Sequence, residues 1–488
     1  MRIVYVPLDD RPLNYAAILR ASATAEAEVL LPPRDLVGSR YHTPSLLLQA
    51  RWLASKCDKN TYLILSLDAL LHGGLIQART SRTDRERTDN ALMLLGKLAE
   101  RSRSVTAFYV LKRLWGNVFR QKDLEELADW EILSRKLAAQ IRGSGKNAAE
   151  FYRSCAENDC GIDDWPDDEV KTLARHRLRQ LDETQTAVRL CSQLGIRLHI
   201  AVEDSVRDGV QEAELEYLLE GHAEGQLTVA DGADEVGAVL LAGALKETGD
   251  EKPIQVVVQD VQAEVAPYES HPVTENLRIL ARLAGAELVE KPDGFAVEIA
   301  GKPTPEDPYP AVVAGNISVP EFSELLESVT PLKEFDEQRV IADLTVTNGV
   351  NAAMLGEFLR AERLPLATVQ CNTISNRIGH ALLLARLFRT APASDALARL
   401  LVSWYIEDLM YLAYLRTWVI ARHGGLEPSD ARQLAAAENS VSSMAEKCAR
   451  KKFNGARFRG RTLEIGEIRL HLPWQRWFEA EADIEVTT

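Results

Sequence analysis

Hydrophobic and polar positions follow two alternating rhythms along most of the chain. Short runs of apolar and β-branched residues, as long as a strand, are followed by segments in which apolar residues recur every three to four positions. This alternation is typical of β-α units with parallel strands, because parallel neighbours need a crossover connection that is usually a helix. The apolar runs predict strands at residues 3–8, 27–31, 62–67, 105–111, 196–202, 227–230, 254–259, 311–315, 339–346 and 366–371.

Helical spacing predicts helices between these runs and two longer helical regions. Residues 120–195 interrupt the alternation, and we interpret them as a helical insertion; residues 393–450 predict a C-terminal helical layer. The tail predicts a short β-hairpin that turns at Gly466-Glu467. The shorter helices are predicted at residues 43–56, 84–102, 211–224, 233–247, 272–285, 320–329, 350–363 and 376–390.

The number of predicted strands bears on the fold class. About ten strands are more than the eight of a single α/β barrel. We therefore predict an α/β fold of mainly parallel sheets with flanking helices, arranged as two α/β lobes, and keep a TIM-like barrel with insertions as the alternative. The predicted domains are residues 1–265, which include the insertion, residues 266–392, and the C-terminal helical region and hairpin of residues 393–488.

Polar residues follow the predicted strands at the point where each strand ends. The first strand stops at Asp9, Asp10 and Arg11, and the next residue is a proline, which cannot continue it. In open α/β sheets and in barrels, ligands bind at the carboxyl ends of the strands, where the loops diverge. Two adjacent carboxylates beside an arginine therefore predict a polar site.

The same pattern recurs after later strands. Asp234 and Glu235 would fall in the first turn of a helix, where capping of the helix dipole is an alternative explanation for a single acid. Asparagines supply neutral donors and acceptors for hydroxyl or amide groups, with helix capping as their alternative role. Gly73 and Gly74 would allow close backbone approach to a ligand and could present N–H groups to an oxyanion. The predicted substrate-binding residues are Arg11, Asn14, Asp68, His72, Gly73, Gly74, Asp204, Glu269, Asp343, Asn348, Asn351, Asn372 and Asn376.

The amino-acid composition limits the binding partners and the cellular compartment that are expected for this protein. The net charge of −15 and the pI of about 5.3 oppose nonspecific binding to nucleic acid or to an anionic membrane. No window of eighteen apolar residues occurs, so no membrane-spanning helix is expected. The six cysteines form neither a disulfide framework nor a paired Cys-x-x-Cys site. These observations predict a cytoplasmic protein whose partner is a small-molecule substrate.

The motifs of several cofactor and metal classes are missing from the sequence. The nine histidines show no zinc spacing, and neither Gly-x-Ser-x-Gly nor Gly-x-Gly-x-x-Gly occurs. We predict no cofactor and assign no metal ligand. A Mg²⁺ or Ca²⁺ site built from Asp9, Asp10, Asp68 or Asp204 stays open as an alternative, because hard cations need no fixed ligand spacing.

Seven stretches of the sequence resemble one family as a set. They are LDDRPLN (Leu8 to Asn14), SLDALLHGGLI (Ser66 to Ile76), DGADEVG (Asp231 to Gly237), APYE (Ala266 to Glu269), DLTVTNGVN (Asp343 to Asn351), CNTISNRIG (Cys371 to Gly379) and LPWQRWFE (Leu472 to Glu479). The chain is similar over nearly its whole length to the bacterial family of unknown function DUF4127, although Cys371 stands where the family pattern has tryptophan. The resemblance implies the fold and the choice of residues, and it carries no established reaction.

The mixture of acids and amides suits hydrolysis of a polyhydroxylated small molecule, such as a glycoside or a cell-wall sugar fragment. Glycoside cleavage needs one protonated carboxyl and a second carboxylate, with neutral groups around the sugar hydroxyls. We predict Asp9, Asp10, Asp234 and Glu235 as the catalytic acids. The alternatives are a Mg²⁺-dependent hydrolase or phosphoryl-transfer enzyme, and a sugar- or metabolite-binding protein without turnover.

Overall fold

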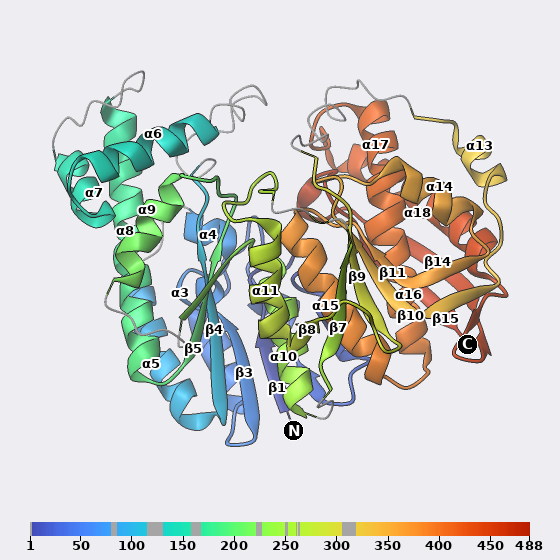
Figure 1. Cartoon of the computed structure of the whole chain (residues 1–488), viewed down its shortest axis with the longest axis horizontal. Helices are drawn as coiled ribbons and strands as arrows, with labels where there is room; N and C mark the ends of the chain where they lie inside the picture. The colour runs from blue at the N-terminus through green and yellow to red at the C-terminus, as the bar shows by residue number, and fades with distance from the viewer. Residues whose placement is uncertain are drawn as a thin grey trace. The chain divides into compact units, whose positions relative to one another are not determined.

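A computed structural model of the chain describes residues 2–79, 85–114, 130–157, 167–220, 227–248, 252–259, 261, 264–304 and 319–488 (Figure 1). Mainly parallel sheets flanked by helices confirm the predicted α/β class. No closed barrel occurs among the described strands, so the barrel alternative is set aside. Within the same ranges, no helix has both the length and the apolar composition that crossing a membrane requires.

The chain forms two compact units, and each is made of more than one stretch of sequence. The first unit contains Met1–Asp9, Leu30–Gly237 and Tyr268–Pro272. The second contains Asp10–Val29, Ala238–Pro267 and Val273–Thr488. The adjacent residues Asp9 and Asp10 therefore belong to different units.

A six-stranded sheet is the centre of the first unit. Its order is β2-β1-β3-β4-β5-β6, and β1 and β3 to β6 pair in parallel. The chain passes from β1 to β2 on one side of β1 and then to β3 on the other side. The loops that follow β1 and β3 therefore diverge at the carboxyl ends of these two strands. The strands are β1 (Arg2–Val6), β2 (Glu28–Leu30), β3 (Thr61–Ser66), β4 (Ser104–Leu111), β5 (Arg197–Val202) and β6 (Leu227–Asp231).

Helices surround this sheet, and several of them pack on one another. In the predicted insertion, α7 packs along α8 and α6 contacts α9 (Figure 1). The apolar faces of α3, α5 and α8 bury leucines and alanines in the same core as the strands. The helical elements of this unit are η1 (Arg34–Leu36), α2 (Leu46–Lys56), α3 (Leu67–Leu71), α4 (Leu75–Arg79), α5 (Arg85–Arg101), α6 (Trp130–Gly143), α7 (Ala148–Glu157), α8 (Asp167–Gln193) and α9 (Val210–Leu219).

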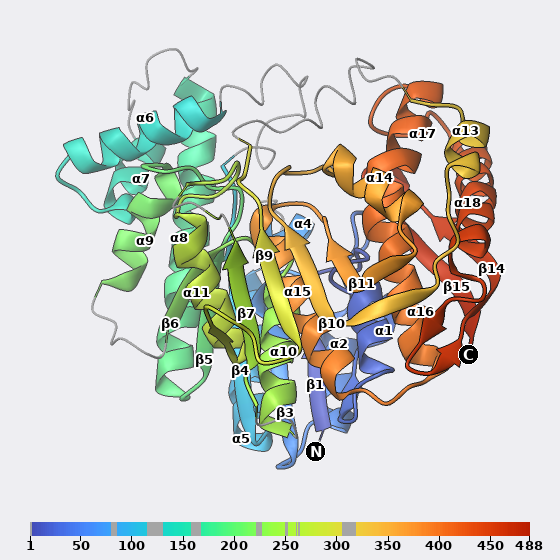
Figure 2. The same cartoon turned by 45° about the vertical axis from the view of Figure 1, so that its right-hand side comes forward.

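The second unit is built on another parallel sheet. Its main path runs β8-β7-β9-β10, and β11 pairs with β10 (Figure 2). The predicted strand at residues 311–315 lies outside the described residues, and β8 and β9 were not predicted because their apolar runs are short. The strands are β7 (Ile254–Gln259), β8 (Ala286–Leu288), β9 (Ala296–Ala300), β10 (Glu334–Asp343), β11 (Arg363–Val369), β12 (Arg457–Phe458) and β13 (Arg461–Thr462).

One buried helix and a layer of later helices complete the second unit. Helix α15 (Ile374–Thr390) packs against β9, β10 and β11 (Figure 2). Most of its side chains are buried. Helix α10 (Val236–Thr248) begins in the first unit and continues in the second. The remaining helical elements are α1 (Ala16–Ser22), α11 (Val273–Ala284), α13 (Phe322–Glu327), α14 (Ala352–Arg360), α16 (Asp395–Trp404), the π-helix η3 (Tyr405–Leu415), α17 (Arg416–His423), α18 (Ala431–Phe453) and η4 (Pro473–Gln475).

The C-terminal hairpin differs from its prediction. Strand β14 (Glu464–His471) runs through Gly466-Glu467 and pairs antiparallel with β15 (Glu481–Thr487). The register shifts between Ile465 and Ile468, so Gly466-Glu467 is a bulge within one strand and the predicted turn there is wrong. A glycine in a short apolar run fits a turn and a bulge equally well in the sequence, and only strand pairing distinguishes them.

Candidate functional site

The carboxyl edge of the first sheet is lined with charged residues. Because parallel strands end at the same edge, residues that are far apart in sequence become neighbours there. These charged residues are buried, and Asp68, Lys112 and Glu203 are held in ion pairs. They follow five strands, namely Asp9 after β1, Asp68 after β3, Lys112 after β4, Glu203 after β5 and Asp231 at the end of β6.

Asp68 is paired with Lys112. The carboxylate lies 2.6 Å from the Lys112 Nζ, and neither side chain is exposed to solvent. The backbone N–H of Val110 donates to the other Asp68 oxygen at 2.8 Å, and the ammonium lies 3.5 Å from the ring centroid of Tyr109. Burial lowers the pKa of Lys112, although the nearby Asp68 carboxylate opposes this effect. Asp68 therefore neutralises a buried cation in this structure.

The turn of His72, Gly73 and Gly74 is tied into the same region. The backbone N–H groups of both glycines donate to the Asp68 carbonyl, at 3.1 and 3.2 Å, so these donors are occupied. A Cβ atom on Gly38 would lie 1.7 Å from the Gly73 carbonyl oxygen, so the close approach made here is between two backbone segments. Burial and nearby cations lower the pKa of His72 well below its usual range, which keeps its imidazole neutral.

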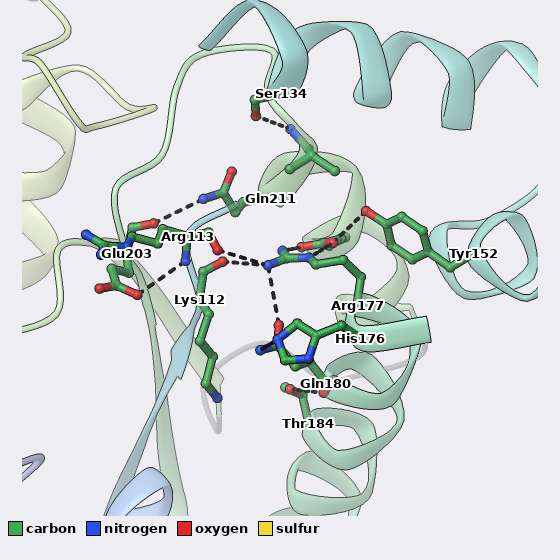
Figure 3. Close-up of polar contacts among 12 residues, drawn as sticks. Lys112, Arg113, Ser134, Tyr152, His176, Arg177, Gln180, Thr184, Glu203 and Gln211 are labelled. Carbon is green, nitrogen blue, oxygen red and sulfur yellow. Dashed lines mark hydrogen bonds and ion pairs between the residues drawn. The ribbon is translucent and has the colours of Figure 1, made fainter. Parts of the chain in front are cut away.

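A buried polar network extends from β4 to α8 and α9 (Figure 3). The Arg177 guanidinium pairs with the Glu214 carboxylate, which also accepts a hydrogen bond of 2.8 Å from the Tyr152 hydroxyl. Arg177 donates further to the Lys112 carbonyl at 2.8 Å and to the Gln180 side-chain oxygen at 3.3 Å. Because every charge here has a partner, the network fastens the insertion helices to the sheet.

Glu203 and Asp204 are also paired. Glu203 is buried, pairs with the Arg79 guanidinium and accepts the backbone N–H of Arg113 at 3.2 Å. Asp204, which has a left-handed φ of 42°, lies 3.1 Å from an Arg113 nitrogen. These contacts make the end of β5 an ion-paired corner.

Glu235 departs from this pattern of pairing. It is fully buried, and no cationic side chain among the residues that the structure describes forms an ion pair with its carboxyl; only the backbone N–H groups of Ala233 and Glu235 itself lie close enough to oppose the effect of burial. Burial, with the nearby charges of Asp234 and Glu269, raises the pKa of Glu235 well above its usual range. The carboxyl folds back over Gly232, where a Cβ atom would lie 1.9 Å from the Glu235 Oε1. Burial therefore favours the protonated form of the Glu235 carboxyl.

Other predicted acids accompany Glu235. The buried Asp9 and the half-buried Asp234, together with burial itself, raise the pKa of the Tyr5 phenol. The start of α10 lies against this phenol, because a Cβ atom on Gly237 would be 1.9 Å from the Tyr5 hydroxyl oxygen. We call Asp9, Asp234, Glu235 and Glu269 the acid cluster, since each acts electrostatically on Tyr5 or on another member.

The prediction from sequence passed over Asp231, which holds the neighbouring segment in place. One carboxylate oxygen accepts from the hydroxyls of Ser205 and Ser270, at 2.9 and 2.8 Å. The other accepts the backbone N–H groups of Ser270 and His271, at 2.9 and 2.7 Å, and lies 3.1 Å from the His271 Nδ1. Asp231 stands in one of the quoted stretches, but no spacing rule links it to a histidine forty positions later.

In the second unit, Arg377 organises the loops that follow β10 and β11. This buried guanidinium donates to the carbonyl oxygens of Asp343 at 2.5 Å, Cys371 at 3.3 Å and Gly349 at 3.0 Å, and also to that of Val346. Burial lowers the pKa of Arg377 despite the nearby acids. Arg377 was not among the predicted site residues, although it lies inside a quoted stretch.

The four predicted asparagines that follow β10 and β11 have different roles. Asn348 and Asn372 adopt left-handed φ values of 50° and 33°, and the Asn348 N–H donates to the Asn372 carbonyl at 2.9 Å. Asn351 caps α14 by accepting the Ala353 N–H at 3.0 Å. The Asn376 amide donates to the Thr373 hydroxyl at 3.1 Å. Turn geometry and capping thus account for three of the four.

A group of buried polar atoms near these loops has no partner in the described part of the chain. The atoms are Asp343 Oδ2, Thr347 Oγ1, both side-chain polar atoms of Gln370, and Asn376 Oδ1. Asp343 and Gln370 follow the paired residues Ala342 and Val369, so the two strands bring them to the same level. Polar atoms buried without partners call for water or ligand. We call Asp343, Thr347, Gln370 and Asn376 the polar cluster.

The N-terminal motif and the C-terminal motif meet within the second unit. The Trp474 indole N–H donates to the Asp10 Oδ1 at 2.7 Å, and the Arg11 guanidinium carbon lies 5.3 Å from the Trp474 ring centroid. Asn14, three residues after Arg11, is buried, and its backbone N–H donates to the Arg11 carbonyl at 3.0 Å.

Within the described ranges, no group of three or more histidines, cysteines and acids is arranged to hold a metal ion. Four buried cysteines, at positions 57, 191, 371 and 448, form no disulfide, while Cys155 is disulfide-bonded, which the cysteine pattern did not predict.

Two mainly parallel sheets, with buried acids and amides at their carboxyl edges, define an α/β protein that gathers polar side chains at strand ends. A family model described as a protein of unknown function, DUF4127, matches residues 3–483. The chain belongs to this family, which confirms the resemblance seen in its motifs. No curated protein and no solved structure matches the chain.

Proposed function

We propose that the protein is a hydrolase of a polyhydroxylated small molecule, such as a glycoside or a cell-wall sugar fragment. The observation that carries the proposal is the state of Glu235, whose buried carboxyl has a strongly raised pKa. A carboxylic acid that keeps its proton at neutral pH can donate that proton to a leaving-group oxygen.

The neighbouring acids suit the positive charge that develops during glycoside cleavage. The transition state resembles an oxocarbenium ion, which a nearby carboxylate stabilises. Asp234 precedes Glu235 in sequence and is half-buried, so its carboxylate is closer to water than the Glu235 carboxyl. We assign proton donation to Glu235 and electrostatic stabilisation to Asp234.

Replacing Glu235 by glutamine tests this role, because the amide keeps the shape and cannot donate an acidic proton. We expect Glu235→Gln to slow hydrolysis of phenyl glycosides by about 10²- to 10⁴-fold. The loss should be much smaller for 2,4-dinitrophenyl glycosides, whose leaving group needs no proton. Steady-state rates across both series, with and without EDTA, give the measurement.

The matched control is Glu100→Gln, which changes an exposed acid at the end of α5 and should leave both rates unchanged. An equal loss for both leaving groups, or no loss, would show that Glu235 is not the proton donor. Activity that EDTA abolishes and Mg²⁺ restores would favour metal-assisted hydrolysis instead.

The polar cluster favours a second candidate function, binding of a sugar or metabolite without turnover. Its neutral amides and hydroxyl suit hydroxyl recognition, and α/β folds serve binding as readily as catalysis. Calorimetric titration with monosaccharides and N-acetylated sugars tests it. Binding that Gln370→Leu weakens, together with no hydrolysis of any glycoside by the parent protein, would establish binding as the function.

The proposed setting is the cytoplasm, with neither nucleic acid nor membrane as a partner. The net charge of −15 and the four cysteines that form no disulfide support this location, whereas the disulfide at Cys155 argues against it. Fractionation of cells that express the tagged protein checks the compartment.

A further inference from the structure

We infer that His271, oriented by Asp231, is the base that takes a proton from the attacking water. This inference rests on the proposed hydrolase function. The residues assigned there include a proton donor and a stabilising carboxylate but no general base. The inference starts from the contacts of the Asp231 carboxylate.

Asp231 is held rigidly at the end of β6. Its carboxylate is fully buried, and two serine hydroxyls and two backbone N–H groups fix both oxygens, at distances of 2.7 to 2.9 Å. The His271 Nδ1 lies 3.1 Å from one of these oxygens. A carboxylate fixed in this way sets the orientation of the imidazole ring.

The contact also selects the tautomer of the imidazole. An ionised carboxylate only accepts hydrogen bonds, so the Nδ1 of a neutral His271 carries the hydrogen and Nε2 carries the lone pair. The Ser270 hydroxyl, 3.0 Å from the same Nδ1, can turn its hydrogen toward Asp231. The His271 side chain is 35% exposed, so solvent reaches its ring, whereas the Asp231 side chain that orients it is fully buried.

A purely structural role for Asp231 accounts for part of this arrangement. The segment Tyr268–Pro272 belongs to the first unit, and the Ser205 N–H donates to the Tyr268 carbonyl at 2.9 Å. Tyr268 has a left-handed φ of 69° and stacks on Trp130 at 6.3 Å. The contacts of Asp231 with the backbone and with the two serines already hold this segment in place. Holding the segment therefore does not require an imidazole at position 271.

The acid and the proposed base belong to the same two segments. Glu235 follows β6 by four residues, and Glu269, two positions before His271, acts electrostatically on Glu235. The loop after β6 and the segment Tyr268–Pro272 thus carry a buried carboxyl whose pKa is raised and an imidazole that Asp231 orients.

The proposed step balances as a hydrolysis. The His271 Nε2 takes a proton from water as the water oxygen bonds to the acetal carbon. The bond from that carbon to the leaving oxygen breaks, and the leaving oxygen takes the proton of Glu235. Two hydroxyl products remain, and His271 and Glu235 then exchange protons with solvent.

Replacing His271 by alanine, in the full-length protein, tests the inference with the phenyl glycoside that the parent hydrolyses. We expect His271→Ala to lose about 10²- to 10⁴-fold in rate. Added imidazole should restore part of the loss, which it could not do if His271 only held the segment. The exposed His471→Ala is the control, and imidazole should leave its rate unchanged. Asp231→Asn should lower the rate without rescue by imidazole, because Asp231 is a positioning residue.

The outcomes separate this inference from the proposed function. If Glu235→Gln is inactive and His271→Ala keeps the parent rate, the hydrolase stands and the base is another group. Failure of imidazole to restore any activity overturns the base role as well. If the parent hydrolyses no glycoside, the proposed function and the base role are both overturned. In an active parent, ¹⁵N NMR of the histidines gives a test that is independent of the variants, because an Nε2–H tautomer for His271 overturns the base role alone.

Discussion

At the scale of single residues, ion pairing distinguishes the acids that stabilise the fold from Glu235, the acid that we propose as the proton donor. Asp68 and Asp204 were predicted as site residues because they follow strands, and the structure pairs them with Lys112 and Arg113. Glu235 was predicted on the same grounds and forms no ion pair with a cation among the described residues. A strand-end acid is visible in the sequence, but its partner is not.

The buried pair of Arg177 and Glu214 gives a stability prediction. Glu214→Ala would leave the Arg177 guanidinium, which is 1% exposed, without its carboxylate. We expect a loss of about 3–5 kcal/mol in the free energy of unfolding, as for other broken buried pairs. Urea denaturation followed by circular dichroism measures it.

The control lies two residues further along the same helix. Glu216 pairs with Arg142 at 2.9 Å, but its side chain is 63% exposed. Glu216→Ala should therefore cost about 1 kcal/mol or less. Equal losses for the two variants would contradict a special role for the buried pair.

At the scale of elements, the π-helix η3 directs two adjacent acids into separate buried contacts. Glu407 pairs with Arg20 of α1 and accepts the Ala482 N–H, while Asp408 accepts the Gln370 N–H at 2.5 Å. Burial raises the pKa of each acid to about 7. π-Helices are rare and often mark functional regions, and here the element joins the end of β11 to the C-terminal hairpin.

The raised pKa of Asp408 predicts a pH dependence of stability. Between about pH 4, where an unfolded aspartate titrates, and about pH 7, the folded state keeps a proton that the unfolded state has lost. The contribution of Asp408 is therefore present below this window and is lost as the pH rises to about 7. Asp408→Asn should flatten the decline, measured as the free energy of unfolding at pH 5 and pH 8.

The exposed Asp483→Asn is the matched control and should leave the difference between the two pH values unchanged. An Asp408→Asn protein that loses as much stability as the parent between pH 5 and pH 8 would contradict the assignment to Asp408.

At the scale of the whole molecule, the units do not correspond to two halves of the sequence. Residues 10–29 belong to the second unit, where α1 packs on α16 and Arg20 donates to the Ala482 carbonyl at 3.0 Å. Arg20 of this segment is also the cation that pairs with the buried Glu407. The second unit therefore depends on a segment more than two hundred positions before the rest of its chain.

This dependence predicts how fragments behave. Residues 238–488 alone should lack cooperative thermal unfolding, because Glu407 loses Arg20 and α16 loses its contact with α1. A fusion that joins residues 10–29 to residue 238 through a flexible linker should recover a cooperative transition, measured by circular dichroism. The same fusion with Arg20→Ala should recover less of it, and a cooperative transition for residues 238–488 alone would contradict the prediction.

The sequence by itself determined the α/β class, the strands of the first sheet, strands β7, β10 and β11 of the second sheet, and the placement of acids and amides at strand ends. It could do so because hydrophobic periodicity and strand-breaking residues act over a few neighbouring positions. Only the tertiary structure decided that Gly466-Glu467 is a bulge, that Asp68 is neutralised by Lys112, and that Asp231 holds His271. Those outcomes depend on burial and on contacts between distant segments, since desolvation and pairing set the ionisation of an acid and neither is encoded by its neighbours in sequence.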